Sequence, residues 1–502
     1  MSLSIIYSRA RVGVSSPLVT VETHISNGLP SLSIVGLPET AVKESKDRVR
    51  SALINSGFEF PNRRITINLA PADLPKEGGR YDLAIALGIL AASHQLPVES
   101  LKDSEFIGEL ALTGDVRSVK GCLPAAMACG KEGRTLYVPA QNSEEASLCR
   151  STRMLAADHL LQVCANIKGD SLLPELTFDD NSQESLIVPD LLEVKGQFLA
   201  RRALEIAAAA SLNLLFYGPP GTGKSMLASR LPGILPGLTE NEALEVAAIH
   251  SIGGQPVDIA SWGRRPFRTP HHTASAVALV GGGSSPKPGE ISLAHNGVLF
   301  LDELPEYSRK VLEVLREPLE SGHIAISRAA SQITFPARFQ LVAAMNPCPC
   351  GYYGHPSIEC TDTPQQVTKY RQKLSGPLLD RFDMHVEVPA QAADVLISKS
   401  LNAESSETVK ARVLMAREIQ FQRSGKANRE LSGSELEDVC KLNNQSRTLL
   451  ENAMNRLGLS ARAFHRVLRV ARTIADLQQV DVVSMQHITE ALGYRKLDRK
   501  AT

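Results

Sequence analysis

Alternating hydrophobic and polar segments divide the chain into regions of different character. Over roughly the first 165 residues, short apolar runs that are typical of buried strands occur at 31–37, 64–70 and 135–140. Between them, hydrophobic residues recur at helical spacing at 40–57 and 81–93. This alternation of strands and helices predicts an α/β domain.

Beyond this region the pattern changes twice. A polar stretch without periodicity, PELTFDDNSQES at 174–185, predicts a linker. From Val188 to about Ala390, strands and helices alternate again with loops rich in glycine and proline. From Asp394 to Gly493 the chain has few such residues and repeated helical periodicity, which predicts a helical bundle. We therefore expect domains at 1–167, 188–390 and 391–502, with a linker at 168–187.

Composition narrows the range of functions. The 502 residues include 54 Lys+Arg and 54 Asp+Glu, so a surface for nucleic acid has to be local. No segment approaches the roughly 18 to 20 apolar residues of a membrane span, and the N-terminal apolar run is too short for a signal peptide. Eight scattered cysteines favour a reducing compartment. We expect a cytoplasmic protein without a membrane partner.

The segment LNLLFYGPPGTGKSMLASRL contains the pattern G-x-x-x-x-G-K-S between an apolar run and a helical pattern. Successive backbone N–H groups and a helix N-terminus form an anion cradle in such a loop, which sets it apart from a simple glycine-rich turn. Lys224 is then expected to contact the β- and γ-phosphates of a nucleotide, and Ser225 to bind Mg²⁺. The predicted nucleotide-binding residues are Gly218, Pro219, Pro220, Gly221, Thr222, Gly223, Lys224, Ser225, Met226 and Asp302.

Three further segments place polar residues where they can act on a bound nucleotide. GVLFLDEL ends an apolar strand at Asp302 and Glu303, which are either a helix N-cap pair or a magnesium ligand and the base that activates water. The strand FQLVAAM ends at Asn346, which is positioned to contact the γ-phosphate or the attacking water. Arg381, in SGPLLDRFDMHVEV, either pairs with a neighbouring aspartate or stabilises transition-state charge at a neighbouring subunit's nucleotide.

The order of these motifs, followed by SARAFHRVLRVAR in the helical region, resembles an AAA+ ATPase of the magnesium-chelatase/MCM branch. Long segments such as VKGQFLARRALEIAAA and RPFRTPHHTASAVALVGGG are similar to the magnesium chelatase-like ComM/YifB family, and the similarity covers nearly the whole chain. The resemblance implies that Asn346 is sensor 1 and Arg381 an arginine finger acting in trans. It makes Arg462 sensor 2, with Arg466 as the fallback. ATP and Mg²⁺ are the implied cofactors, and a hexameric ring of identical subunits is the implied assembly.

A local basic segment is the candidate for DNA binding. No acidic residue lies between Ile259 and Gly289, and the local formal charge is +4. Its basic residues are Arg264, Arg265, Arg268, His271, His272 and Lys287. The alternative is a solvated loop or a subunit contact. A second candidate is a β-hairpin predicted at 323–335 with Arg328 near its tip. In the branch that the chain resembles, both segments point into a central pore, which implies contact with DNA.

The N-terminal domain resembles the fold shared by the Lon proteolytic domain and the C-terminal domain of RadA. Arg80 stands where Lon-type proteases have the nucleophilic serine, and Leu123 stands where they have the lysine. Because a Ser–Lys dyad needs both groups, we expect no peptidase activity. The predicted fold class is therefore α/β: a Lon/RadA-like domain, a P-loop AAA+ core and a C-terminal helical lid.

The family resemblance implies a ring-forming, ATP-driven DNA motor with helicase or branch-migration activity. Such a motor supports homologous recombination and the integration of DNA in natural transformation. The alternative is an AAA+ protein-remodelling ATPase or a chelatase-like motor subunit without DNA translocation. The sequence shows no aromatic–hydrophobic–Gly pore loop of the protein-unfoldase kind, which weighs against a substrate-threading unfoldase.

A cysteine-rich stretch, NPCPCGYYGHPSIEC, directly follows the strand that ends at Asn346. Cys348, Cys350, His355 and Cys360 offer four soft ligands that suit tetrahedral Zn²⁺. Members of the family often have a second C-x-C pair here, whereas this chain has Asp362 two residues after Cys360, so either His355 or Asp362 has to substitute. Bound zinc, free thiols and a disulfide all remain open.

Overall fold

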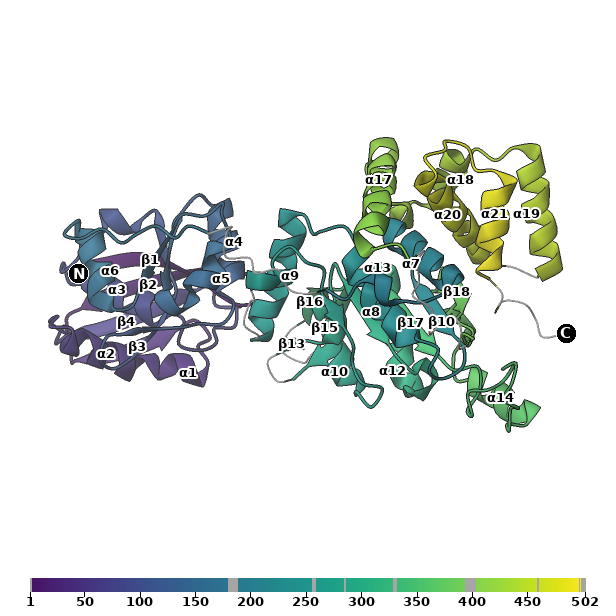
Figure 1. The fold of residues 1–502 in the computed structure, drawn as a ribbon. Helices are drawn as coiled ribbons and strands as arrows, with labels where there is room; N and C mark the ends of the chain where they lie inside the picture. Colours follow the sequence, from purple (N-terminus) through teal and green to yellow (C-terminus); the bar gives the residue numbers. More distant parts are fainter. Residues whose placement is uncertain are drawn as a thin grey trace. The chain divides into compact units, whose positions relative to one another are not determined.

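The computed structural model describes residues 2–178, 188–254, 259–283, 286–327, 332–392, 403–457, 460–495 and 497. The chain divides into two compact units (Figure 1). The N-terminal unit comprises Met1–Ser185, Glu240–Trp262 and Ser327–Phe335. The C-terminal unit comprises Leu186–Thr239, Gly263–Ile326 and Pro336–Thr502.

The N-terminal unit is built on a seven-stranded mixed sheet in the order β3-β4-β2-β1-β5-β8-β9. Its strands β1, β2 and β4 pair antiparallel, and the remaining neighbours pair parallel. Alternate residues of β2 are buried, which is the period that a strand with one face on the core requires. The strands are β1 (Ser2–Arg9), β2 (Leu18–Ser26), β3 (Ser31–Val35), β4 (Arg64–Ala70), β5 (Ser104–Phe106), β8 (Thr135–Pro139) and β9 (Met154–Ala157), with a small β6 (Glu109–Leu110) and β7 (Val116–Arg117) pair beside them.

Helix α3 (Asp82–Ala92) lies at the centre of this unit and is apolar on every side. All of its residues are buried, and it packs against β1 and β2. The helix predicted at 40–57 is interrupted at Glu44, which ends one helix and caps the next. The other helices are α1 (Thr40–Lys43), α2 (Ser45–Asn55), α4 (Cys122–Lys131), α5 (Ser143–Ser147) and α6 (Leu160–Lys168).

Two segments that the sequence pattern assigned elsewhere pack in the N-terminal unit. Helix α9 (Glu240–Gly253) follows the P-loop helix in the chain, yet it packs on α4, and Ala247 joins the buried cluster around Leu123. The first half of the predicted linker also belongs here, because the Leu176 N–H donates to the Met154 carbonyl at 3.0 Å. Apolar contacts with α4 and β9 therefore set these limits, and residue spacing along the chain does not reveal them.

The C-terminal unit contains a five-stranded parallel sheet in the order β11-β14-β17-β10-β18. Its inner strands β14 and β17 are buried at every position, as a parallel sheet covered on both faces requires. The strands are β10 (Leu214–Tyr217), β11 (Phe267–Arg268), β14 (Val298–Leu301), β17 (Gln340–Met345) and β18 (Met384–Glu387). Ligands of such sheets bind at the carboxyl ends of the strands.

Helices and short strands surround this sheet. Helix α7 (Phe198–Ala210) precedes β10, and α8 (Lys224–Ile234) follows it. The short helices are α10 (Ala276–Val280), α11 (Glu290–Leu293), α12 (Arg309–Glu313), α13 (Arg316–Ser321), α14 (Pro364–Arg371) and α15 (Gly376–Leu379). The short strands β12 (Gly281–Gly282) and β13 (Lys287–Pro288) pair with each other in this unit. A second pair is formed by β15 (His323–Ser327) and β16 (Gln332–Pro336), of which β16 is assigned largely to the N-terminal unit. The second pair confirms the predicted hairpin strands, whereas Arg328 lies outside the described residues.

The C-terminal lid is helical, as the sequence predicts. It consists of α17 (Ser406–Ser424), α18 (Gly433–Cys440), α19 (Asn444–Leu457), α20 (Ala461–Leu477) and α21 (Met485–Gly493). One hydrophobic cluster joins lid residues such as Val413 and Val470 to sheet residues such as Leu214 and Val386. The lid and the sheet therefore share a core.

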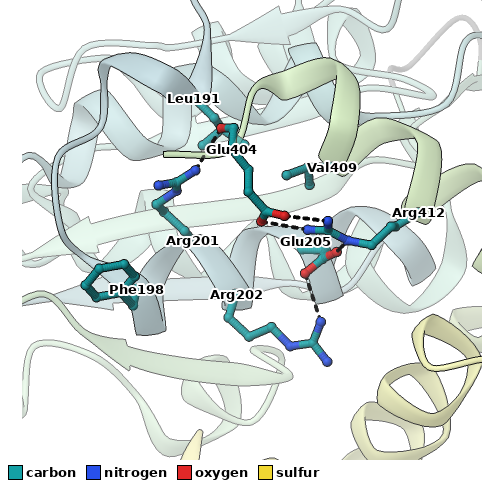
Figure 2. Close-up of a pocket in the computed structure, with 8 residues that line it drawn as sticks. All are labelled: Leu191, Phe198, Arg201, Arg202, Glu205, Glu404, Val409 and Arg412. Carbon is teal, nitrogen blue, oxygen red and sulfur yellow. Dashed lines mark hydrogen bonds and ion pairs between the residues drawn. The ribbon is translucent and has the colours of Figure 1, made fainter. Parts of the chain in front are cut away.

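A network of ion pairs adds to this core where α17 meets α7 (Figure 2). Arg412 donates from Nε to Glu205 at 2.5 Å and from both terminal nitrogens to Glu404 at 2.7 and 2.9 Å. Glu205 is almost fully buried and also accepts from Arg202 at 2.8 Å. Arg201 donates to the Glu404 carbonyl at 2.8 Å. These charges line a small pocket together with the apolar side chains of Leu191, Phe198 and Val409.

We expect Glu205→Gln to lower the thermal unfolding midpoint of the full-length protein, at a cost of roughly 2 kcal/mol, because it leaves two guanidinium groups without their buried counter-charge. The matched control is Glu404→Gln, which removes a half-exposed partner of the same Arg412 and should cost less than about 1 kcal/mol. Equal midpoints for the two variants would show that burial does not decide the strength of this network.

Candidate active site

The loop between β10 and α8 has the shape of an anion cradle. Gly221 and Gly223 have φ of +74° and +88°, in the left-handed region that favours glycine. A Cβ at Gly218 would lie 2.2 Å from the Val388 carbonyl oxygen, so only glycine fits beside the end of β18. Gly223 caps α8, whose N-terminus therefore faces the loop. The structure thus gives residues 218–223 the conformation that the sequence motif predicts.

Lys224 is buried and turns back onto this loop. Its ammonium group donates to the carbonyls of Gly218 and Pro219 at 2.8 and 2.7 Å, and to Asn346 Oδ1 at 3.1 Å. Burial lowers the pKa of Lys224 to about 8, against the opposing effect of the Asp302 and Glu303 carboxylates. The lysine is therefore held in place by weak acceptors that phosphate oxygens can replace.

Ser225 and Asp302 meet at the mouth of the cradle. The Ser225 hydroxyl donates to Asp302 Oδ2 at 2.5 Å, and Asp302 Oδ1 accepts the backbone N–H of Glu303 at 2.9 Å. A hydroxyl and a carboxylate held this close are oxygen ligands of the kind that Mg²⁺ prefers. The donor set therefore fits the predicted magnesium site.

Glu303 faces a histidine that the sequence assigned to DNA binding. Its Oε2 lies 3.2 Å from His272 Nδ1, and Glu303 itself has a left-handed φ of +50°. The His272 ring packs against the His271 ring at 4.1 Å and meets Tyr307 edge-on. The two histidines, Asp302 and Glu303 line one pocket together with Thr269, Pro270 and Phe300. Because β11 lies next to β14, the loops that follow these strands meet at one edge of the sheet.

Arg381 is buried between α15 and the amino end of β18, away from the carboxyl ends of the strands. Its guanidinium forms an ion pair with Glu320, and the predicted structural alternatives, Asp380 and Asp383, are not its partners in the described residues. Its Nε atom has no hydrogen-bond partner there. Asn213 fixes the backbone by donating to the Arg381 carbonyl at 2.8 Å. The guanidinium is thus held by one exposed carboxylate, which it can leave.

Two lid arginines on α20 lie beside this segment. Arg466 Nε and Arg469 Nη1 are 3.8 and 3.5 Å from Asp383 Oδ1. Arg466 is buried, and its Nη1 has no hydrogen-bond partner in the described chain. Arg462 is exposed instead. Arg466 therefore lies next to the segment that carries Arg381, and the choice between Arg466 and Arg462 as sensor 2 stays a prediction.

In the basic segment after residue 259, two of the arginines make contacts within the protein. Arg265 donates to the carbonyls of Pro236 and Asn296 at 2.8 and 2.6 Å. Arg268 makes a two-point ion pair with Glu290, with both distances 2.8 Å. Arg264 is half-buried, whereas Lys287 is exposed. Sequence counting missed Glu290 because it lies one residue beyond the interval without acids.

Three cysteines and one aspartate form a tight cluster just after β17. The three Sγ–Sγ distances among Cys348, Cys350 and Cys360 are 3.4, 3.7 and 3.5 Å, and the four ligand atoms including Asp362 lie within 4.8 Å of one another. His355 lies outside this group of four, because its Nδ1 accepts the N–H groups of the loop residues that follow it at 3.2 and 3.0 Å. The predicted set with His355 is therefore corrected to one with Asp362. All eight cysteines are free thiols.

Sequence reasoning missed one residue that contacts the cradle. Gln197 precedes α7, and its Nε2 donates to the Thr222 carbonyl at 3.2 Å and to the Pro389 carbonyl at 2.8 Å. It therefore ties the P-loop to the segment after β18. The signal in the sequence is weak, because a single glutamine before a helix has many other uses.

The positions of a Lon-type dyad hold buried residues in the N-terminal unit. Arg80 donates to the Lys120 carbonyl at 3.4 Å, and Leu123 is fully buried.

Across the part of the chain that the structure describes, no helix has both the length and the hydropathy to cross a membrane.

The lowered pKa of Lys224 predicts a pH dependence of nucleotide binding. A bound phosphate raises the lysine pKa again, so binding takes up a proton above pH 8. The affinity for ATP should be constant below about pH 8 and fall roughly tenfold per pH unit up to about pH 10. The measurement is the Kd of a fluorescent ATP analogue from pH 7 to 10. In Lys224→Arg the guanidinium does not titrate, so the same slope in that variant would contradict the assignment.

Comparisons with known proteins agree with this geometry. Residues 190–396 match the family described as magnesium chelatase, subunit ChlI. Residues 21–142 match the description subunit ChlI of Mg-chelatase, and residues 403–495 match the C-terminal part of the same subunit.

Individual relatives cover the whole chain. The sequence is 54% identical to the protein named competence protein ComM from Haemophilus influenzae, over 99% of this chain and 98% of that protein. It is also 54% identical to YifB from Escherichia coli, with the same shares covered. A shorter similarity, 26% identity over 35% of this chain and 50% of the relative, connects it to the magnesium-chelatase 38 kDa subunit of Cereibacter sphaeroides. The chain therefore belongs to the ComM/YifB family of magnesium chelatase-like AAA+ proteins.

Proposed function

We propose that this protein is a ring-forming, ATP-driven DNA motor, a hexamer, that carries out helicase or branch-migration reactions. In this role it supports homologous recombination and the integration of DNA in natural transformation. The observation that carries the proposal is the meeting of Lys224, Ser225, Asp302, Glu303 and Asn346 at one edge of the parallel sheet. The name of its Haemophilus relative supports the connection to competence. We place the protein in the cytoplasm, where free thiols persist.

Each residue of the site has its own role in the hydrolysis of ATP. The backbone N–H groups of the cradle bind the phosphates, and Lys224 exchanges its carbonyl contacts for the β- and γ-oxygens. Ser225 and Asp302 would hold Mg²⁺, which would neutralise phosphate charge. Glu303 accepts a proton from the attacking water on a carboxylate oxygen, while Asn346 orients that water.

Arg381 completes the site of a neighbouring subunit in this proposal. Its only ion-pair partner among the described residues is an exposed glutamate, and one buried guanidinium nitrogen is unpaired, so a phosphoryl group can compete for it. Arg466 and Arg469 fix the backbone of this segment through Asp383, whose carboxylate also accepts the Asn213 N–H at 2.8 Å. Hydrolysis is then coupled to contacts between subunits.

The contact between His272 and Glu303 supports a coupling of DNA to hydrolysis. The loop that carries His272 continues into the strand pair where Lys287 is exposed. A phosphate backbone that binds near Lys287 therefore pulls on the loop that positions the catalytic base. The contacts are to phosphates, so binding is independent of sequence and depends on salt.

DNA should accelerate ATP hydrolysis by the full-length protein. We expect single-stranded or forked DNA to raise the rate several-fold, and Lys287→Ala to weaken DNA binding and lower its salt dependence by about one phosphate contact. The matched control is Lys310→Ala, a basic residue outside the segment. No stimulation and no salt-dependent binding would favour the alternative, a protein-remodelling or chelatase-like ATPase without DNA translocation.

Mixing two inactive variants tests whether Arg381 acts in trans. Lys224→Ala lacks a working cradle but keeps Arg381, whereas Arg381→Ala keeps the cradle and nucleotide binding. Each variant alone should be inactive. A one-to-one mixture should recover activity at about a quarter of its interfaces, because a head-to-tail ring combines one subunit's cradle with its neighbour's arginine. If Arg381 acts within its own chain, the mixture stays inactive.

A further inference from the structure

We propose that Cys348, Cys350, Cys360 and Asp362 bind one structural zinc ion, and that this metal holds the loop after β17 against the P-loop. The first half goes beyond the proposed function. The second half rests on it, because it concerns the nucleotide cradle.

The sulfur positions fit a tetrahedral metal site. Zn–S bonds of about 2.3 Å place sulfurs about 3.8 Å apart in a tetrahedron, and the observed separations of the three cysteine sulfurs are 3.4, 3.5 and 3.7 Å. A disulfide requires about 2.05 Å. A single metal ion accounts for the convergence of all three thiols, which the backbone N–H of Tyr353 on Cys348 Sγ alone does not explain.

The aspartate completes the ligand set. Asp362 Oδ2 lies 3.9 Å from Cys360 Sγ and accepts the Cys350 N–H at 2.8 Å, which orients its carboxylate toward the sulfurs. Three thiolates favour zinc over magnesium or calcium, which prefer oxygen ligands. Four protein ligands leave no open position, so the ion is structural and does not activate water.

The metal loop touches the nucleotide cradle at two points. A Cβ on Gly351, next to the ligand Cys350, would lie 2.7 Å from Pro220 Cδ, so the loop backbone packs directly on the P-loop. At the other point Asn346, two residues before Cys348, contacts Lys224 at 3.1 Å. Arg371 of α14 closes the loop by donating to the Pro347 carbonyl at 3.1 Å. Zinc therefore fixes both contacts by fixing the short loop between them.

Metal content tests the site itself. Full-length protein from zinc-supplied cells should contain one zinc per chain by elemental analysis, and a thiol-blocking reagent should release it to a chromogenic chelator. Asp362→Ala should lose zinc, and Asp362→Cys should keep it because thiolate replaces carboxylate. The matched control is His355→Ala, which should also keep it. No metal in the wild type, iron in place of zinc, or loss of zinc only in His355→Ala overturns the assignment.

Nucleotide affinity tests the contact with the P-loop separately. Removing zinc from the wild type should weaken the binding of a fluorescent ATP analogue by about tenfold, and restoring zinc should reverse this. Gly351→Ala should weaken binding by about tenfold, because the new methyl group meets Pro220 and φ is +86°. Unchanged nucleotide affinity after zinc removal overturns the proposal that the metal holds this loop against the P-loop. If zinc-loaded wild type binds no nucleotide at all, the proposed ATPase fails while the zinc site stands.

Discussion

The parallel pairing of β14, β17 and β10 is the constraint on which the rest of this protein depends. Because neighbouring parallel strands end at one edge of a sheet, Asp302, Asn346 and the P-loop are adjacent although more than a hundred residues separate the first and last of them along the chain. The loop that carries His272 follows the edge strand β11, and Arg381 precedes the other edge strand, β18. One hydrogen-bonded ladder therefore assembles groups for binding phosphate, holding a metal and activating water.

The charged groups at this edge have protein partners, and those of Lys224 are weak hydrogen-bond acceptors. Lys224 donates hydrogen bonds to two carbonyls and an amide oxygen, and Glu303 faces a histidine. Away from this edge, before β18, Arg381 pairs with an exposed glutamate. A charged phosphate oxygen is a stronger acceptor for the Lys224 ammonium group than the two carbonyls and the amide that it contacts. The site therefore keeps its geometry while remaining ready to exchange every contact that hydrolysis requires.

Motif spacing and hydrophobic periodicity predicted what is local. The strand β4, the helix α3, the P-loop and the helical lid follow from patterns within short segments. Features that depend on contacts between residues far apart in the sequence could not be predicted from such patterns. Helix α9 packs on α4 through small apolar residues, Glu290 neutralises Arg268 from outside the basic interval, and Asp362 rather than His355 faces the cysteines. Burial likewise separates Arg466 from Arg462, which share one helix and one spacing.

We propose that hydrolysis at this edge of the sheet moves DNA strands. The most direct measurement is strand exchange on a labelled three-stranded junction, with the full-length protein and ATP. The wild type should move the branch point with ATP but not with a non-hydrolysable analogue, and Lys224→Ala should not move it at all. Movement that continues with the analogue, or a junction left unchanged by a protein that hydrolyses ATP, would show that hydrolysis does not move DNA.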